Sequence, residues 1–338
     1  MEERKIFFHT ELNMNESKSR RVVVVGSCNT DLIAYTPRFP LPGETLHGHS
    51  FETGFGGKGA NQCVACAIRI AKGGDDGKIV PRVDMVAAVG NDFFGRETVE
   101  NFKNHGVGVE HVTIMDGERT GCAPIWVNDE GENSIVIIGG ANDKLSAEHI
   151  DAACSVLEDA HIVMTQLEIS VDTTAHAMQL AHKKGRRSLT IFNPAPARKD
   201  LPEELLSECD IIVPNETEAE ILTGIAVDCE DSADRAAAQL MAMGCKVVII
   251  TLGERGAFVA TADGFRKMVA APPAEKVVDT SGAGDCFLGS FAYCIAASGE
   301  EDVDKMCSQE VLLEACQYAV KCATMSVQGR GTQSSFDF

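Results

Sequence analysis

Short, wholly apolar runs that alternate with helical patterns are the feature that most limits how this chain can fold. The first run covers residues 22–25 and is four valines long. Such a run is typical of a strand buried on both faces of a parallel sheet. Similar runs recur at 83–89, 161–167, 189–192, 211–213 and 247–251. Helical patterns occupy 59–71, 94–105, 147–157, 171–184, 216–223, 233–243, 287–297 and 309–326. The alternation predicts an α/β fold, a three-layer α/β/α doubly wound and mostly parallel sheet.

Two stretches, about 44–51 and 123–138, interrupt this alternation with β-like runs. Because their apolar residues have no adjacent helix to pack on, we expect a small sheet that stands off the main one. A sheet over the carboxyl ends of the strands would act as a lid that excludes water. We therefore predict one domain over 21–338, with lid segments at about 36–53 and 122–141. Residues 1–20 are predicted to be a disordered tail, and 71–80 a surface loop.

Composition narrows the possible partners. The chain has 338 residues and a formal net charge of −20, which argues against nucleic acid and against an anionic membrane surface as partners. No apolar run approaches the ~20 residues of a membrane span, and the first twenty residues resemble neither a secretory signal nor a transit peptide. Thirteen scattered cysteines fit reduced thiols. We expect a cytoplasmic protein, and a nuclear pool is compatible with the same features.

The Cys63 and Cys66 pair forms a single CxxC. With no second pair and no flanking histidine, we interpret it as packing on one helix face rather than as a zinc site or a redox pair.

The stretch from Asp279 to Asp285 is the clearest candidate for chemistry. Its small residues Gly282, Ala283 and Gly284 precede a helical pattern, so backbone N–H groups and the helix dipole can hold an anion there. Asp285 then stands at the mouth of an anion-binding turn. It is either a general base that takes a proton from an alcohol, or a helix N-cap.

Polar residues follow several predicted strands, where ligands of an open α/β sheet bind. Asn29, Asp31, Asn61 and Glu168 are the donors and acceptors that a polyol needs, and a carboxylate binds vicinal hydroxyls strongly. Any one of them taken alone could be a turn or cap residue. Asn215 and Glu218 lie one helical turn apart and could hold a hydrated Mg²⁺.

A glycine-rich stretch before the first long helical pattern allows other interpretations. Gly54, Gly56 and Gly59 match the spacing of a dinucleotide fingerprint, but they do not follow the first strand, where that fingerprint belongs. The stretch is not a P-loop either, because Gly59 stands where a P-loop has Ser or Thr. A glycine turn that presents Lys58 and Asn61 to sugar hydroxyls fits better.

Six motifs, in order, resemble those of the ribokinase family of carbohydrate kinases, and the resemblance covers roughly 22–335. They are Asn29-x-Asp31, Gly56–Gln62 (GGKGANQ), Asn193–Ala197 (NPAPA), Pro214–Glu220 (PNETEAE), Thr251–Gly253 (TLG) and Asp279–Asp285 (DTSGAGD), followed by Gly331–Ser335 (GTQSS).

The resemblance implies ATP-dependent phosphorylation of D-ribose at its 5-hydroxyl, giving D-ribose 5-phosphate, with Asp285 as catalytic base. It assigns sugar binding to Asn29, Asp31, Gly57, Lys58, Asn61, Glu168 and Asp285. It assigns ATP binding to Asn215, Thr251, Gly253, Gly256, Gly282, Ala283 and Gly284, and Mg²⁺ through water to Glu218. A K⁺ loop would comprise Asp279, Ser281, Ser326, Gly329, Gly331 and Ser335.

Other functions stay open at this point. A kinase of the same fold could act on 2-deoxyribose, fructose or adenosine. An NAD-dependent oxidoreductase or a non-catalytic sugar-binding protein is more remote, since a binding protein has no need for an anion nest beside a carboxylate. The resemblance also implies a homodimer formed through the lids.

Overall fold

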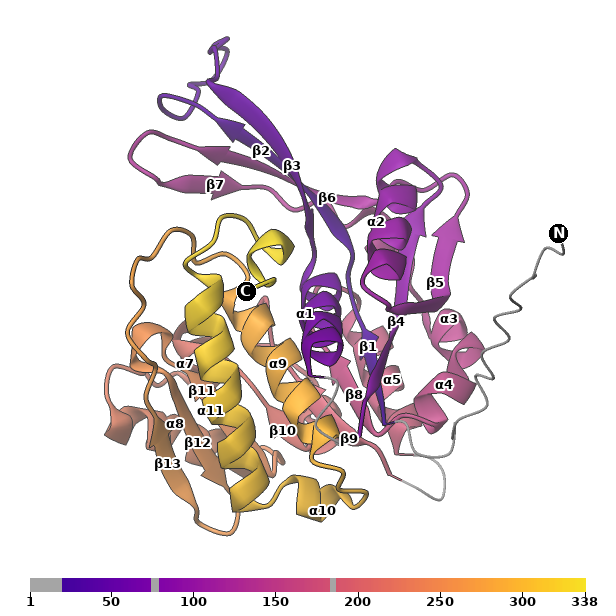
Figure 1. Ribbon diagram of the computed structural model, residues 1–338, viewed down its shortest axis with the longest axis vertical. Coiled ribbons are helices and arrows are strands. Elements are labelled where there is room, and N and C mark those ends of the chain that lie inside the picture. The colour runs from indigo at the N-terminus through magenta and orange to yellow at the C-terminus, as the bar shows by residue number, and fades with distance from the viewer. Residues whose placement is uncertain (1–19, 74–78, 183–186) are drawn as a thin grey trace, which may run out of the picture.

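The computed structural model describes residues 20–73, 79–182 and 187–338. The predicted tail at 1–20 and the loop at 71–80 therefore lie largely outside the described residues. Within the described residues the chain forms a nine-stranded sheet and a separate four-stranded sheet (Figure 1). The predicted fold class is confirmed.

The large sheet has the strand order β13-β12-β11-β10-β9-β8-β1-β4-β5. Its parallel strands are β1 (Arg21–Val25), β4 (Arg82–Gly90), β5 (Gly108–Met115), β8 (Ile162–Thr165), β9 (Leu189–Phe192), β10 (Ile211–Ile212) and β11 (Val247–Thr251). Strands β12 (Ala257–Thr261) and β13 (Arg266–Val269) are antiparallel and form one edge. The six apolar runs are thus strands of one sheet.

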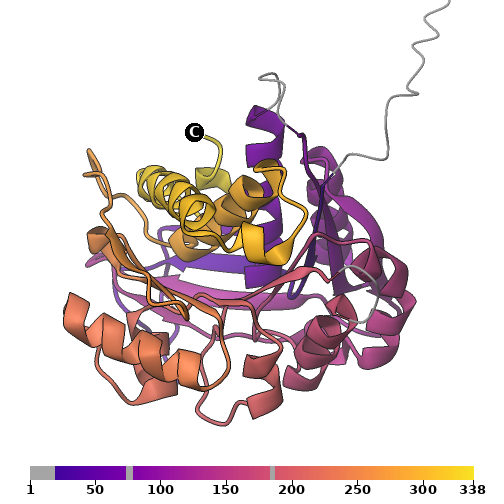
Figure 2. The ribbon, with the colours of Figure 1, turned by 90° about the horizontal axis from the view of Figure 1, so that it is seen from below.

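Helices cover both faces of this sheet, as Figure 2 shows from below. One face carries α1 (Lys58–Lys72), α2 (Phe93–Asn104), α9 (Ala283–Ala297), α10 (Val303–Met306) and α11 (Gln309–Ser326). The other carries α3 (Ala147–Ala152), α4 (Cys154–Glu158), α5 (Val171–Ala181), α6 (Glu203–Ser207), α7 (Glu216–Thr223) and α8 (Glu230–Ala242). Strand β1 is buried on both faces, because its valines alternate between the two hydrophobic clusters.

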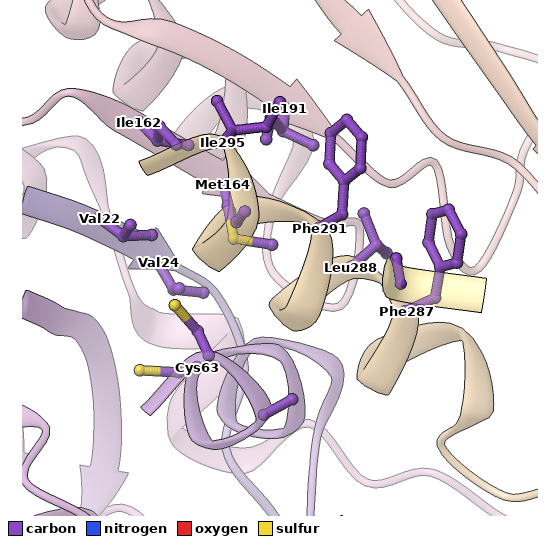
Figure 3. Close-up of a cluster of buried hydrophobic side chains, with 14 of the residues drawn as sticks. Val22, Val24, Cys63, Ile162, Met164, Ile191, Phe287, Leu288, Phe291 and Ile295 are labelled. Carbon is purple, nitrogen blue, oxygen red and sulfur yellow. The ribbon is translucent and has the colours of Figure 1, made fainter. Parts of the chain in front are cut away.

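Helices α1 and α9 pack closely on the first face (Figure 3). A Cβ on Gly289 of α9 would lie 2.4 Å from the backbone oxygen of Gln62 and 2.6 Å from the Cβ of Ala65, so only glycine allows this approach. Cys63 and Cys66 face the same core and are fully buried. All thirteen cysteines lie in the described residues as free thiols, and burial raises the pKa of the Cys66 thiol to about 12. Packing, as interpreted, is the role of this pair.

Some element boundaries differ from the sequence-based prediction for local reasons. The helix predicted at 147–157 is two short helices, which meet at Ala153. Helix α9 begins at Ala283 rather than at 287, because its first turn consists of small residues and Asp285 and therefore shows no apolar pattern. Strands β5, β12 and β13 were not predicted. Strands β5 and β13 lie at the two edges of the sheet, where burial is less uniform, whereas β12 is fully buried between β11 and β13.

The small sheet has the order β3-β2-β6-β7 and projects from the main body (Figure 1). Its strands are β2 (Asn29–Tyr35), β3 (Ser50–Gly56), β6 (Gly121–Val127) and β7 (Asn133–Ile135). The first lid segment, predicted at 36–53, needs correction: β2 begins earlier, and 36–49 contain no strand. Strand β2 escaped notice because it mixes polar and apolar residues without strict alternation. The segment at 122–141 contains most of β6 and all of β7.

None of the helices in the described parts of the chain has both the length and the apolar character needed to cross a membrane.

Candidate active site

The strand ends, the start of α1 and the start of α9 converge below the lid. Strand β1 passes through Ser27 and Cys28 directly into β2, which carries Asn29 and Asp31. Strand β3 leads through Gly57 into α1, which begins at Lys58. Glu168 follows β8, and Asp285 lies in the first turn of α9. The fold therefore brings together the residues predicted to bind sugar and the predicted base.

Glu168 is the centre of the sugar-side cluster. Its Oε2 atom accepts hydrogen bonds from Ser27 Oγ at 2.6 Å, from the backbone N of Lys58 at 3.0 Å and from Asn29 Nδ2 at 3.4 Å. The carboxylate thereby ties β1, β2 and α1 together at one point. Hydrogen bonds that involve a charged acceptor are among the stronger ones in proteins.

Asn142, in the 3-10 helix η2 (Gly140–Lys144), orients Asn29. Its Nδ2 donates to Asn29 Oδ1 at 2.8 Å and to the Cys28 carbonyl at 3.0 Å, and its Oδ1 accepts from the Cys28 N–H at 2.9 Å. Sequence reasoning missed Asn142 and Ser27. Ser27 could have been found from its place directly after the first strand, whereas Asn142 gave no local signal.

Asp31 is a partly buried carboxyl at the lid end of the cluster. Burial, followed by the charges of Glu168 and Asp285, raises its pKa to about 7. Glycine at position 56 is what makes room for it, because a Cβ on Gly56 would lie 2.4 Å from Asp31 Oδ1. Gly57 has a φ of 88°, and its Cβ would lie 2.7 Å from the backbone N of Asn29. Both glycines are therefore required by close approach.

Asp285 is buried, with 7% of its surface exposed. Its two oxygens each accept one side-chain amide from α1: Oδ2 from Asn61 Nδ2 at 2.9 Å, and Oδ1 from Gln62 Nε2 at 3.0 Å. The helix cap of α9 is Gly282, in the left-handed conformation with a φ of 73°. The interpretation of Asp285 as an N-cap is therefore wrong, since Asp285 lies inside the helix and faces α1.

The pKa of Asp285 is raised. Burial is the largest cause, and it outweighs the opposing effects of Lys58 and of the amides of Gln62 and Asn61. For Lys58 the balance is reversed. Burial disfavours its charge, but the carboxylates of Asp285, Glu168 and Glu218 outweigh burial and raise its pKa. Lys58 therefore stays charged among these three acidic groups.

A cavity of about 160 Å³ adjoins Asp285. The turn Gly282–Gly284, Lys58, Asn215, Glu218 and Thr251 line it. A Cβ at Gly284 would meet no described atom within 4 Å, so the backbone is open to a ligand on this side. The positive end of the α9 dipole and the Lys58 ammonium both favour an anion in this cavity.

The residues predicted to contact ATP divide into two groups. Asn215 and Thr251 line the cavity, and Asn215 caps α7, accepting from the Glu218 N–H at 2.8 Å. Gly253 and Gly256 lie in the turn after β11, outside the cavity lining. Gly256 has a φ of 99° and packs against the Val269 carbonyl. The conformation of the turn is therefore enough to explain why position 256 is glycine, without a role in binding ATP.

The loops predicted to hold K⁺ meet beside the anion-binding turn. Asp279 joins them, because its Oδ1 accepts from the Ser281 N–H at 2.9 Å and its Oδ2 from the Gly331 N–H at 3.0 Å. Gly329 lies against Ser335, where a Cβ would be 3.0 Å from the serine Cβ. Ser326 is buried nearby, at the end of α11.

Arg330 connects this loop region to the lid. Its guanidinium lies 5.1 Å from the centre of the Tyr35 ring on β2 and forms an ion pair with Glu52 on β3 at 3.7 Å. Figure 1 shows the C-terminal segment (yellow) just below these strands.

The dinucleotide interpretation receives no support from this geometry. Gly54 and Gly56 belong to lid strand β3, and Gly56 packs against Asp31. The turn that follows β3 is held by Glu168, which accepts a hydrogen bond from the Lys58 N–H. What the site does combine is a hydroxyl-binding cluster, a buried carboxylate and an anion-binding helix start. These features define an enzyme that transfers an anionic group to an alcohol.

Comparison with known proteins specifies the class. The sequence profile of the pfkB family carbohydrate kinases matches residues 19–338. The chain is 41% identical over 324 residues to a ribokinase of Mus musculus, covering 96% of this chain and 94% of that protein. It is also 41% identical over 317 residues to a deoxyribokinase of Salmonella typhi, covering 93% and 95%.

A solved structure agrees. Arabidopsis thaliana ribokinase, complexed with ribose and ATP, superposes with a TM-score of 0.83 at 31% identity, covering 94% of this chain and 95% of that one. The chain belongs to the pfkB family of carbohydrate kinases.

The raised pKa of Asp31 predicts a pH-dependent stability. In the folded protein this pKa is about 7, whereas an exposed aspartate titrates near about 3.9. Between these pH values the native state holds a proton that the unfolded chain has lost, so stability falls as pH rises through 7. We expect Asp31→Asn to raise the Tm of the ligand-free protein at pH 8 by several degrees and to leave it nearly unchanged at pH 4.5.

Differential scanning fluorimetry across this pH range measures the effect. Asp116→Asn, at an exposed turn, serves as the control and should follow the wild-type curve. An equal gain in Tm at both pH values would contradict the proposed ionisation of Asp31.

Proposed function

We propose that this carbohydrate kinase transfers the γ-phosphoryl group of ATP to the 5-hydroxyl of D-ribose. The observation that carries the proposal is the position of Asp285, between the hydroxyl-binding cluster of Glu168 and Asp31 and the anion-binding turn of α9. Its support from relatives is a ribokinase and a deoxyribokinase at the same 41% identity. 2-Deoxyribose is therefore the second candidate substrate.

In the proposed mechanism, Asn29, Asp31 and Glu168 bind the sugar hydroxyls and direct the 5-hydroxyl at Asp285. Asp285 accepts the hydroxyl proton while the sugar oxygen bonds to the γ-phosphorus and the bond from phosphorus to ADP breaks. The backbone N–H groups of Gly282–Gly284 hold the transferring phosphoryl group. Lys58 balances negative charge between the two substrates.

The cavity also has groups suited to Mg²⁺. Asn215 and Glu218 place hard oxygen ligands at its edge, and the Glu218 carboxylate is fixed there by the Asn215 N–H at 2.8 Å. Such ligands suit a cation that keeps several waters. When bound with ATP, Mg²⁺ supplies charge neutralisation for the phosphates. We propose that the enzyme works in the cytoplasm, where its thirteen free thiols stay reduced.

A coupled assay of ADP release across ribose, 2-deoxyribose, fructose and adenosine tests the proposed substrate. We expect ribose to give the highest kcat/KM. A clear preference for 2-deoxyribose would support the second candidate, and a preference for adenosine or fructose would overturn the choice of a pentose.

The role of Asp285 can be tested separately. Asp285→Asn keeps the size of the side chain but removes the base, and only one of the two α1 amide donors keeps an acceptor oxygen. We expect kcat to fall by about 10²–10⁴-fold, the usual contribution of a positioned general base. Ribose binding, measured by calorimetry, should change little. Turnover near that of the wild type would reduce Asp285 to a structural residue.

We further propose that K⁺ activates the enzyme through the Asp279 loop. The donor set fits, because the loop and the tail carry oxygen atoms of the kind that K⁺ takes: the Asp279 carboxylate, the Ser335 hydroxyl and backbone carbonyls. The adjoining Gly282 packs on the tail, where its Cβ would lie 2.4 Å from Thr332. Ordering of this loop would therefore stabilise the anion-binding turn in its working shape.

Titration of KCl against choline chloride at constant ionic strength tests this proposal, since general screening stays fixed. We expect kcat to rise with K⁺ and then saturate, and Asp279→Asn to weaken the response. A flat rate would remove the cation site and leave the assignments of base and sugar site intact.

The lid supports a further proposal, that of a homodimer. The lid exposes Phe51, Ile135, Val136, Ile137 and Ile138 to 50% or more, an unusual concentration of apolar surface for a monomer. Light scattering at micromolar concentration should give twice the chain mass of 36.1 kDa. Ile137→Glu should lower it to one chain mass. A wild-type protein of one chain mass would contradict the dimer.

A further inference from the structure

Two chains of side-chain amides end on Asp285, and neither has a role in the mechanism so far. The first begins on α2, where Asn101 Nδ2 donates to Gln333 Oε1 at 2.8 Å. Gln333, in the 3-10 helix η4 (Gln333–Ser335), donates through Nε2 to Asn61 Oδ1 at 3.0 Å. Asn61 then donates to Asp285 Oδ2 at 2.9 Å.

The direction of this chain follows from the chemistry of amides. An amide side chain can turn by 180° at nearly constant shape, which exchanges its oxygen with its NH₂ group. If Asn61 turned, its oxygen would face the carboxylate of Asp285. Gln333 opposes this, because its NH₂ group needs the oxygen of Asn61 as acceptor. Asn101 in turn fixes Gln333, since it donates to the Gln333 oxygen.

The second chain has the same direction. Gln166 Nε2 donates to Gln62 Oε1 at 2.7 Å, and Gln62 Nε2 donates to Asp285 Oδ1 at 3.0 Å. Gln166 Oε1 is buried, and among the described residues it accepts no hydrogen bond. The orientation of Gln166 thus leaves an acceptor unsatisfied while keeping its donor on Gln62. Each carboxylate oxygen of Asp285 therefore accepts from its own amide donor, and a second amide holds that donor in its orientation.

We propose that Gln333 is a positioning residue for the proposed phosphoryl transfer: it holds Asn61 with its NH₂ group toward Asp285. This inference rests on the proposed function of Asp285 as base. Gln333 lies behind Asn61, away from the cavity lining, and among the described residues its side chain hydrogen-bonds to Asn61 and Asn101. It acts on the base only through the orientation of Asn61.

The consequence of losing Gln333 is a change in the ionisation of Asp285. The charged groups that face Asp285 are Lys58 on α1, Glu168 after β8, Asp31 on β2 and Glu218 on α7. A substitution at Gln333 leaves all four in place. A turned Asn61 would replace a donor by an oxygen, which disfavours the carboxylate and raises the pKa of Asp285. Because the base must be ionised, the acid limb of the pH profile should move to higher pH.

Gln333→Met tests this, since methionine keeps the length and removes both hydrogen bonds. We expect the acid limb of kcat to move up by roughly one pH unit, the usual result of losing one hydrogen bond to a charged group. KM for sugar and for ATP should stay within about twofold, because uniform binding is untouched. Gln328→Met, in the same C-terminal segment, is the matched control and should keep the wild-type profile.

A second variant, at the far end of the first amide chain, reverses the direction of its hydrogen bonds. It remains informative if Gln333→Met fails to fold. In Asn101→Asp the new carboxylate can only accept, so Gln333 must turn its NH₂ group toward position 101 and its oxygen toward Asn61. Asn61 then turns in the same way, and the acid limb should again rise. Asn104→Asp adds the same charge to the exposed face of α2 and should not move it.

Two outcomes would overturn the proposal. One is an unchanged acid limb in both Gln333→Met and Asn101→Asp. The other is a further shift when Gln333→Met is added to Asn61→Ala, because Gln333 would then act without Asn61. Carboxyl ¹³C NMR titration of Asp285, assigned by comparison with Asp285→Asn, measures the same pKa without any substrate. The inference can therefore fail or hold separately from the choice of sugar and from the kinase activity itself.

Discussion

The close packing of α1 on α9 is the contact on which the site depends. Gly289 lets the two helices approach until a Cβ would overlap the Gln62 backbone. At that separation, Asn61 and Gln62 reach the two oxygens of Asp285, which is buried at the start of α9. A buried carboxylate is costly unless hydrogen bonds compensate it. The apolar contacts of Cys63 and Ala65 with α9 therefore stabilise a polar contact that packing alone would not favour.

The sequence predicted most of the strands that are uniformly buried, though not β12, and missed several that are only partly buried. Strands β1, β4, β8, β9 and β11 have apolar residues on both faces, so their character does not depend on neighbours far along the chain. Edge strand β5 and lid strand β2 are only partly buried, and their pairing is decided by the tertiary fold. A local pattern cannot show that 29–35 pair with 121–127, although this pairing is what places Asn29 and Asp31 in the site.

The site was predictable where a residue follows a strand or begins a helix, as Glu168, Lys58 and Asp285 do. It was not predictable where a residue acts through another one. Asn142 and Gln333 lie 113 and 272 residues from the partners that they orient, Asn29 and Asn61. Neither stands at the end of a strand of the main sheet. Their roles come from the direction of hydrogen bonds between amides, which only the folded arrangement reveals.

The charges of the site suggest how it keeps its two substrates apart. Asp31 and Glu168 lie on the lid side of Lys58, whereas Glu218 and the open turn of α9 lie on the cavity side. Hydroxyl groups are attracted to the acidic side, and phosphate is repelled from it. On the cavity side, the backbone N–H groups and the helix dipole favour phosphate without further cations beside Lys58, in a chain whose net charge is −20. Asp285 lies at the boundary, where its hydrogen bonds to α1 fix it between an alcohol and an anion. The same helix contact that buries the base thus also separates the two binding regions.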